Sequence, residues 1–208
     1  YAITQEIAVT NVGCRVTSCD LATGSPDRAN TVIDGGGNCR GFRIGKGVDA
    51  CIEVRGFTVK NGSAVDGGGV YMNGGASSLA NLAKRCRLVD CTITNCTASN
   101  NGGGINFLQG LATNCLITGC QATKYGGGAC ASRAVQYNNA RANEHEFGTA
   151  YDCDFVGNYA GVQGGAFCAS VGHHWHTYLV RNSRFRDNTA KDRGGHLDVA
   201  SGSWIENC

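Results

Sequence analysis

Short glycine runs that recur along the chain constrain its fold more than any other sequence feature. The 208 residues include 32 glycines but only one proline. A strict G-x-y period is missing, which excludes collagen, and the apolar residues between the runs exclude a disordered linker. The runs lie at residues 35–37, 67–69, 102–104, 126–128, 164–165 and 194–195. Repetition of this kind indicates a solenoid, in which each repeat stacks on the next.

Aligned on these runs, five copies share one template. Each has a short alternating apolar segment, a small or amide residue, an alanine, the glycine run and a second apolar segment. Alternation such as Thr92-Ile93-Thr94 favours strand over helix, and Asn, Asp and Gly between the segments fit tight corners. The copies lie near residues 51–74, 86–111, 112–140, 151–180 and 181–204.

One copy cannot bury its own apolar face, so like strands must pair in parallel, about 4.8 Å apart, with like side chains in columns. A β-sandwich or propeller would instead show Asn-Gly or Asp-Gly hairpins. We therefore predict one all-β domain over residues 1–208, a right-handed parallel β-helix whose longest loop insertions lie at 132–150 and 169–181. The predicted columns are Val59, Ile93, Ile117, Phe155 and Phe185, and Val70, Ile105, Ala129 and Ala166.

Cysteines recur inside the repeat. Stacked Cα atoms about 4.8 Å apart fall within the range of about 4.4 to 6.8 Å that a disulfide tolerates. We expect a disulfide between Cys96 and Cys120, because that pair lies at a polar corner. Disulfides and buried thiols are equal alternatives for the second column, which holds Cys91, Cys115 and Cys153.

Composition indicates in which compartment the protein lies and which partners are excluded. Thirteen cysteines without a dominant CxxC metal pattern favour an oxidising compartment, so we expect an extracellular or cell-surface location. A formal net charge of +2 with scattered arginines argues against a nucleic-acid partner. No apolar stretch approaches the roughly 18 residues of a membrane span, so we expect no membrane insertion.

Two copies resemble a known repeat family. Phe155-Val156-Gly157-Asn158 followed by Gly164-Gly165-Ala166, and residues 185–188 followed by 194–195, resemble the FxxN and GGA(I/L/V) repeats of polymorphic outer membrane proteins, the β-helical passengers of bacterial autotransporters. More loosely, residues 31–200 are similar to right-handed β-helix proteins of bacterial surfaces and polysaccharide processing. The resemblance implies a bacterial β-helix that is exposed at the cell surface and adhesive.

Enzymes also use this fold, and glycoside hydrolysis on it needs two carboxylates that face one groove. The Asp-Asp, His-Gly and Arg-Ile-Lys signatures of polygalacturonases have no match, the nearest string being residues 43–46 with Gly45 where Lys is needed. The Arg-x-Pro-x-x-Arg run of pectate lyases is also missing, since the one proline is Pro26. No catalytic residue is assigned, and the sequence favours a protein without enzymatic activity.

The polar loop residues are weak candidates for a metal site or a sugar platform. Histidine and carboxylate side chains bind Zn²⁺, and Trp175 would stack on a sugar ring. The alternative is a pair of solvated loops, and because no fixed metal-ligand spacing is present we expect no cofactor, with Ca²⁺ or Zn²⁺ kept as an alternative that no motif supports. The metal candidates are His173, His174, His176, Glu144 and His145.

The chain ends are candidates for assembly. Residues 204–208 read like the start of another repeat, so we expect either a fragment of a longer protein or a unit that stacks head to tail into filaments through Tyr1, Trp204 and Cys208. The sequence thus predicts a non-enzymatic extracellular structural or adhesive protein, able to self-assemble. The alternative is a carbohydrate-active β-helix, a polysaccharide lyase or a glycan-binding module, that uses the two long loops.

Overall fold

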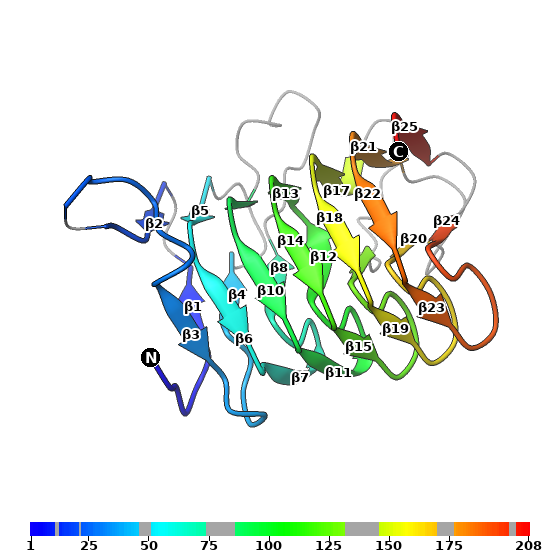
Figure 1. The fold of residues 1–208 in the computed structure, drawn as a ribbon, viewed down its shortest axis with the longest axis horizontal. Coiled ribbons are helices and arrows are strands. Elements are labelled where there is room, and N and C mark those ends of the chain that lie inside the picture. Colours follow the sequence, from blue (N-terminus) through cyan, green and yellow to red (C-terminus); the bar gives the residue numbers. More distant parts are fainter. Residues whose placement is uncertain are drawn as a thin grey trace, which may run out of the picture.

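The computed structural model describes the chain over most of its length. It covers residues 1–10, 13–20, 22–45, 51–73, 86–131, 146–169, 177–199 and 203–208. Within these ranges every strand pairs in parallel and no helix is present, so the predicted all-β parallel coil is confirmed (Figure 1). Nothing in the same ranges forms a helix long and apolar enough to cross a bilayer.

The described strands form four parallel sheets, named here A to D. Sheet A contains β3 (Val32–Asp34), β6 (Thr58–Lys60), β10 (Thr92–Thr94), β14 (Leu116–Thr118), β18 (Asp154–Val156) and β22 (Arg184–Arg186). Sheet B contains β1 (Ile7–Val9), β4 (Phe42–Ile44), β8 (Val70–Asn73), β12 (Ile105–Gln109), β16 (Ala129–Ala131), β20 (Phe167–Ala169) and β24 (Leu197–Val199).

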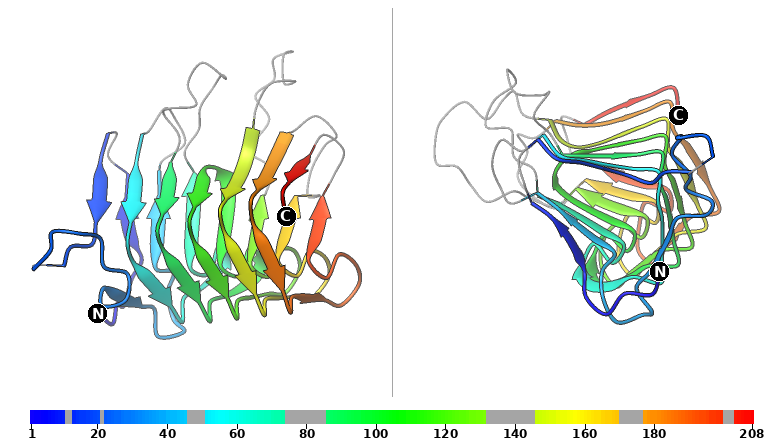
Figure 2. Two further views of the ribbon diagram at one scale, coloured as in Figure 1. Left: turned by 45° about the horizontal axis from the view of Figure 1, so that its top comes forward. Right: turned by 90° about the vertical axis from the view of Figure 1, so that its left-hand side faces the viewer.

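The other two sheets complete each coil. Sheet C contains β2 (Arg15–Thr17), β5 (Glu53–Arg55), β9 (Arg87–Val89), β13 (Leu111–Thr113), β17 (Glu146–Tyr151), β21 (Thr177–Arg181) and β25 (Trp204–Glu206). Sheet D contains β7 (Ser63–Asp66), β11 (Thr97–Asn101), β15 (Gln121–Ala122), β19 (Tyr159–Ala160) and β23 (Thr189–Ala190). Seen from the N-terminal end, the chain runs clockwise from sheet C through A and D to B as it recedes, which is the right-handed sense (Figure 2).

Left-handed residues close three corners of each coil from that of β6 to that of β22. In the coil of β10 they are Asp90 (φ 54°) between sheets C and A, Asn95 (φ 51°) between A and D, and Gly102 (φ 64°) between D and B. Asn, Asp and Gly are the residues that adopt this conformation at low cost. The turn composition of the repeat therefore follows from its corners.

The third glycine of a run is required by close approach between coils. A Cβ atom on Gly104 would lie 2.6 Å from the carbonyl oxygen of Gly128 and 3.0 Å from a methyl carbon of Ile117, both in the next coil. Contacts this short leave no room for a side chain. The glycine runs thus mark the place where successive coils are closest.

The first predicted core column is confirmed. Ile93 lies opposite Val59 and Ile117, and the column continues through Phe155 to Phe185. All but Phe185 are buried, and Phe155 stacks on Phe185 with ring centroids 5.2 Å apart.

The second column is correct for three of its four members. Val70, Ile105 and Ala129 lie in register, but Phe167 and not Ala166 lies opposite Ala129. Ala166 instead takes the place of the third glycine, since its carbonyl accepts the Ala129 amide as the Gly128 carbonyl accepts that of Ile105. This copy therefore keeps the register of the coil, with alanine in the place of the third glycine.

The predicted insertions are shorter than expected. Residues 146–151 belong to β17 and 177–181 to β21, because both segments pair along sheet C, and Ala169 still belongs to β20. Apart from residue 21, every range outside the described residues follows a strand of sheet B and precedes a strand of sheet C. At this same corner the single residue Gly110 joins β12 to β13.

Substituting Gly104 with Ala should lower the free energy of unfolding by about 1 to 3 kcal/mol, because the added methyl group meets the next coil. Chemical denaturation monitored by circular dichroism measures the change. Gly157→Asn is the matched control, since nothing lies within 4 Å of a Cβ there and the equivalent Asn95 shares its positive φ. The control should stay within about 0.5 kcal/mol; equal losses for the two variants would contradict the close-approach argument.

Candidate functional site

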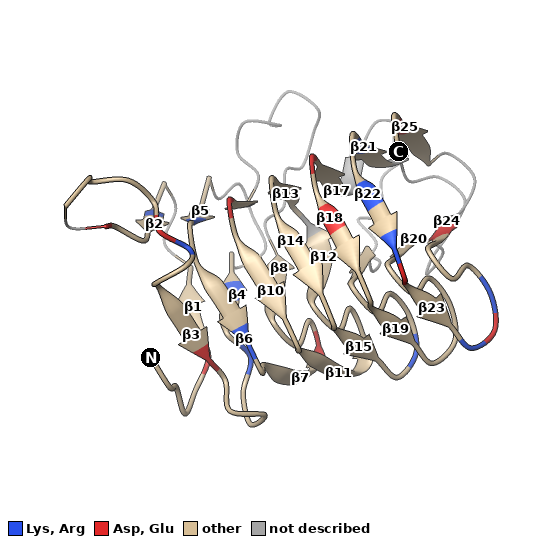
Figure 3. Cartoon of the chain, in the orientation of Figure 1, with Lys and Arg blue, Asp and Glu red and all other residues tan. Residues whose placement is uncertain are grey.

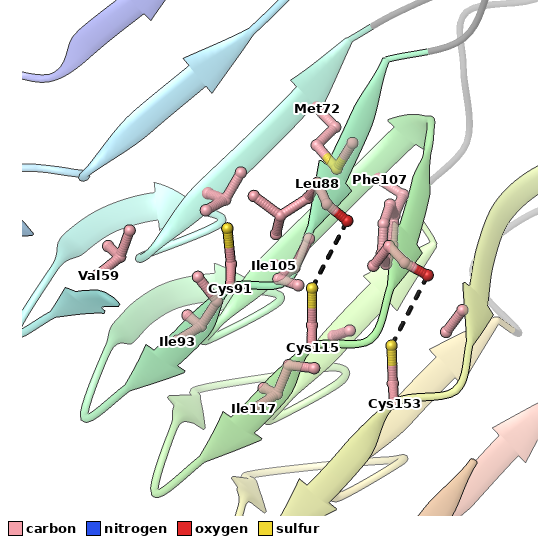
Figure 4. Close-up of a cluster of buried hydrophobic side chains, with 14 of the residues drawn as sticks. Val59, Met72, Leu88, Cys91, Ile93, Ile105, Phe107, Cys115, Ile117 and Cys153 are labelled. Carbon is pink, nitrogen blue, oxygen red and sulfur yellow. Dashed lines mark hydrogen bonds between the residues drawn. The ribbon is translucent and has the colours of Figure 1, made fainter. Parts of the chain in front are cut away.

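A thiol ladder lines the interior between sheets C and A. The Cys115 thiol donates to the carbonyl of Thr113 at 3.3 Å and to that of Leu88, in the preceding coil, at 3.5 Å. Cys91 and Cys153 repeat this pattern, and all three thiols are buried (Figure 4). Each thiol therefore fills the core and also links two coils by hydrogen bonds.

The same column continues toward the C-terminal end of the coil. The Ser183 hydroxyl donates to the Arg181 carbonyl at 2.9 Å, and Cys208 donates to the carbonyls of Glu206 at 3.2 Å and Val180 at 3.8 Å. The Cys208 residue is exposed, yet its thiol makes the bonds of the interior column. Its predicted role in assembly stays a prediction.

A second ladder lies between sheets A and D. Asn158 donates through Nδ2 to the Asn188 Oδ1 at 2.8 Å and to the Ile117 carbonyl at 3.0 Å, and its Oδ1 accepts the Cys120 amide at 3.0 Å. Cys96 and Cys120 hold this position in the two preceding coils. The asparagine of the FxxN repeat is therefore a buried link between coils, a role that the motif alone does not reveal.

The cysteines of the two ladders are present as thiols. Cys96 and Cys120 interact directly through their side chains, and their disulfide stays a prediction. Burial raises the pKa of Cys91 to about 12 and holds that of Cys120 well above its usual range. A buried thiol with a raised pKa is a poor nucleophile, so Cys91 and Cys120 contribute by packing. The hydrogen bond with Cys120 instead lowers the pKa of Cys96.

Charged residues lie along the strands and turns of the coil (Figure 3), and several form ion pairs between adjacent coils. Glu53 is only 7% exposed and forms two ion pairs. One is with Arg15 of the preceding coil, at 3.2 Å, and the other is with Arg55 of its own strand, at 3.0 Å. Arg184 donates to both carboxylate oxygens of Asp154, at 2.6 and 2.7 Å. Further pairs between coils are Arg40–Glu6, Lys60–Asp34, Arg55–Asp90 and Arg181–Glu206.

The predicted polar-loop site lies outside the described residues. Glu144 and His145 fall in the range 132–145, and His173, His174, Trp175 and His176 fall in the range 170–176. His196 alone among the histidines is described, at the last turn into sheet B. Among the described residues, no three His, Cys, Asp or Glu side chains gather in a way that would hold a metal ion.

The predicted assembly residues lie at the two edges of the coil. Tyr1 is 84% exposed beside β3, where its carbonyl accepts the Asp34 amide. Trp204 is 61% exposed in β25 at the opposite edge of sheet C, and its neighbour Ile205 is 40% exposed. Head-to-tail association through these edges stays a prediction.

No protein-family model, curated protein or solved structure matches this chain.

Replacing Asn158 with Ala should lower the free energy of unfolding by about 1 to 3 kcal/mol, because it leaves the buried Cys120 amide without an acceptor. Denaturant titration measures the loss. Asn114→Gly is the control, because glycine keeps the positive φ and only an exposed bond to Asp90 is lost. If the two variants were equally stable, Asn158 would not be a structural link.

The buried thiols should make the protein sensitive to alkali. Because the pKa of Cys91 rises from 9.0 to about 12 on folding, its contribution is complete below pH 9 and is lost as the pH rises toward 12. Urea titrations in reductant at steps between pH 7 and pH 11 should show a falling free energy of unfolding. Cys91→Ala should flatten this dependence; a slope identical to the parent's would contradict the assignment.

Proposed function

We propose that this chain is a non-enzymatic structural and adhesive scaffold of an extracellular, bacterial cell surface. The observation that carries the proposal is that polar side chains of the described residues form bonds between adjacent coils, both in the interior and on the outer faces. Asparagine and cysteine ladders link the interior, and ion pairs between coils link the outer faces. Such cross-links suit a stiff solenoid that has to hold its shape.

The placement of the carboxylates favours this role over glycoside hydrolysis. Hydrolysis needs one carboxyl group kept protonated and one kept ionised across a groove. Asp154 is instead bound by both donors of Arg184, and Asp34 pairs with Lys60. Bonds to Gly36 and Asn61, with Lys60 beside them, hold the pKa of Asp34 below its usual range, which favours the ionised form of this residue.

The cell-surface part of the proposal rests on the FxxN and GGA resemblance more than on cysteine content. Eight of the thirteen cysteines are buried, and those of the two ladders have a packing role in any compartment. The asparagines of both FxxN copies, Asn158 and Asn188, lie in the ladder, so the motif belongs to the coil itself. Our proposal therefore includes that the chain belongs to the polymorphic outer membrane protein family.

Adhesion is assigned to the connections from sheet B to sheet C. From β5 onward the other three corners are turns within the repeat, whereas this corner receives the ranges 46–50, 74–85, 132–145 and 170–176. Gly110 shows that the corner closes with a very short connection, so the coil does not need the longer ones. A surface protein can therefore vary these segments while its core stays constant.

The test replaces residues 132–148 with Leu-Gln-Gly, the residues that join Phe107 to Leu111 in the preceding coil. The register supports this exchange, since Phe107 pairs with Ala131 and Leu111 with Thr149. The variant should keep its circular dichroism spectrum and melting temperature but lose at least about tenfold in binding to plates coated with polygalacturonate, cellulose or peptidoglycan.

The matched control carries Asp154→Asn on the outer face of sheet A, which should leave binding unchanged. Unchanged binding by the shortened variant, or no binding by the parent, would contradict the adhesive assignment. The same polysaccharides are assayed for products over time. Release of sugar fragments by the parent would overturn the non-enzymatic assignment and support a lyase or hydrolase.

A further inference from the structure

Four exposed side chains form a row along the outer face of sheet D, on strands β11, β15, β19 and β23 (Figure 1). Each residue directly follows a buried residue of the ladder between sheets A and D, so its side chain points outward where the ladder side chain points inward. Successive members lie opposite each other in adjacent strands, about 4.8 Å apart. The row consists of Thr97, Gln121, Tyr159 and Thr189.

Tyr159 presents an aromatic ring at the surface of this row. It is 41% exposed and lies between Gln121 and Thr189 in the register of sheet D. Glycines stand two residues before and two residues after it, at Gly157 and Gly161, so neither of these positions carries a side chain that could cover the ring. The ring is therefore an open, flat surface between two polar neighbours.

The backbone on both sides of the ring is held by neighbouring coils. The Tyr159 amide donates to the Cys120 carbonyl at 2.9 Å, and the Asn158 carbonyl accepts the Thr189 amide at 2.9 Å. Asn158 itself is buried in the ladder. The backbone that carries the ring is therefore ordered before a ligand arrives, which lowers the entropic cost of binding.

The side chains of the row are available for a ligand and carry no charge. No hydrogen bond, ion pair or ring contact within the described ranges engages any of them. By contrast, ion pairs such as Arg184–Asp154 on sheet A and Arg15–Glu53 on sheet C engage side chains of the other outer faces. Strands β15, β19 and β23 contain no charged residue (Figure 3). The row thus offers hydroxyl groups, one amide and one aromatic ring.

We propose that this row binds a neutral polysaccharide chain that lies along the axis of the coil. The ring of Tyr159 stacks on the apolar face of a sugar ring. Gln121 and the threonines exchange hydrogen bonds with sugar hydroxyl groups, because an amide and a hydroxyl both donate and accept. An acidic polysaccharide would need a basic side chain in the row, which contains none. The site is separate from the connections to which adhesion is assigned, and it stands without that assignment.

The size of the row favours a saccharide over a protein partner. Strands β15, β19 and β23 have two residues each, so the row is about 7 Å wide. From Thr97 to Thr189 it extends over three strand spacings, about 14 Å. The resulting area of about 100 Å² is far below the roughly 800 Å² that each partner buries in a stable protein interface. A single saccharide chain needs no wider surface.

The experiment titrates the isotope-labelled chain with neutral β-1,4-linked hexasaccharides of xylose, mannose and glucose and follows the amide resonances by NMR. One ring and a few hydrogen bonds support a dissociation constant of about 1 mM, which is measured in solution and not on washed plates. The parent should bind at least one of the three, with the largest shifts at Gln121, Tyr159 and Thr189. Hexagalacturonate should bind at least about tenfold more weakly.

Variants test the ring directly. Tyr159→Ala should raise the dissociation constant at least about tenfold, and Tyr159→Trp should keep it within about threefold of the parent, because the flat ring is what the sugar contacts. Tyr1→Ala is the matched control, since it removes an exposed ring outside the row and should leave binding unchanged. Circular dichroism confirms that each variant is folded.

The variant with Leu-Gln-Gly in place of residues 132–148 separates this site from the proposed adhesion, because it should bind the hexasaccharide as the parent does. A parent that binds none of the three saccharides overturns the site, as does equal affinity of the parent and folded Tyr159→Ala. Binding that is lost in the shortened variant but kept in Tyr159→Ala would place the saccharide on the connections and overturn the row as its site.

Discussion

Backbone hydrogen bonds between successive coils are the constraint on which the rest of the structure depends. Parallel strands stand about 4.8 Å apart, so every residue meets its counterpart in the next coil and little room is left along the axis. Where a Cβ would point along that axis, as at Gly104, an added methyl group would meet the neighbouring coil. Where the chain turns a corner, Asn, Asp or Gly supplies the left-handed conformation. Close approach between coils and left-handed corners recur along the solenoid, and both favour glycine. This is why glycine runs recur in the sequence.

The same spacing explains why cysteine and asparagine share one interior position. A short side chain at the corner between sheets A and D can reach the carbonyl of the preceding coil, as Asn158 reaches Ile117 and Cys120 reaches Ile93. Both side chains also accept an amide from the preceding coil, Asn158 that of Cys120 and the Cys96 sulfur that of Gly62. The thiol in addition fills the core as a small apolar group. A high cysteine content can therefore arise from packing inside a solenoid, without disulfides.

The coil and its connections differ in how far they vary. The coil is cross-linked by ladders inside and by ion pairs outside, and from β5 onward three of its corners keep the same short turns. The connections from sheet B to sheet C vary in length, as expected where binding segments are carried on a rigid frame. At the turn into β24, His196 takes the place of the third glycine, and its Nδ1 atom lies 3.2 Å from the Asn188 carbonyl oxygen. Single residues thus change the contacts within otherwise uniform columns.

The sequence by itself determined the parallel β-helix and the column from Val59 to Phe185, because alternation and glycine runs repeat within each copy. Only the tertiary structure decided that Phe167 replaces Ala166 in its column, that the coil resumes at Glu146, and that the FxxN asparagines link coils. It also placed Tyr159 between Gln121 and Thr189, while the predicted loop site lies outside the described residues. The physical reason is that register and hydrogen-bond partners belong to the contact between two coils, and no single repeat contains that contact.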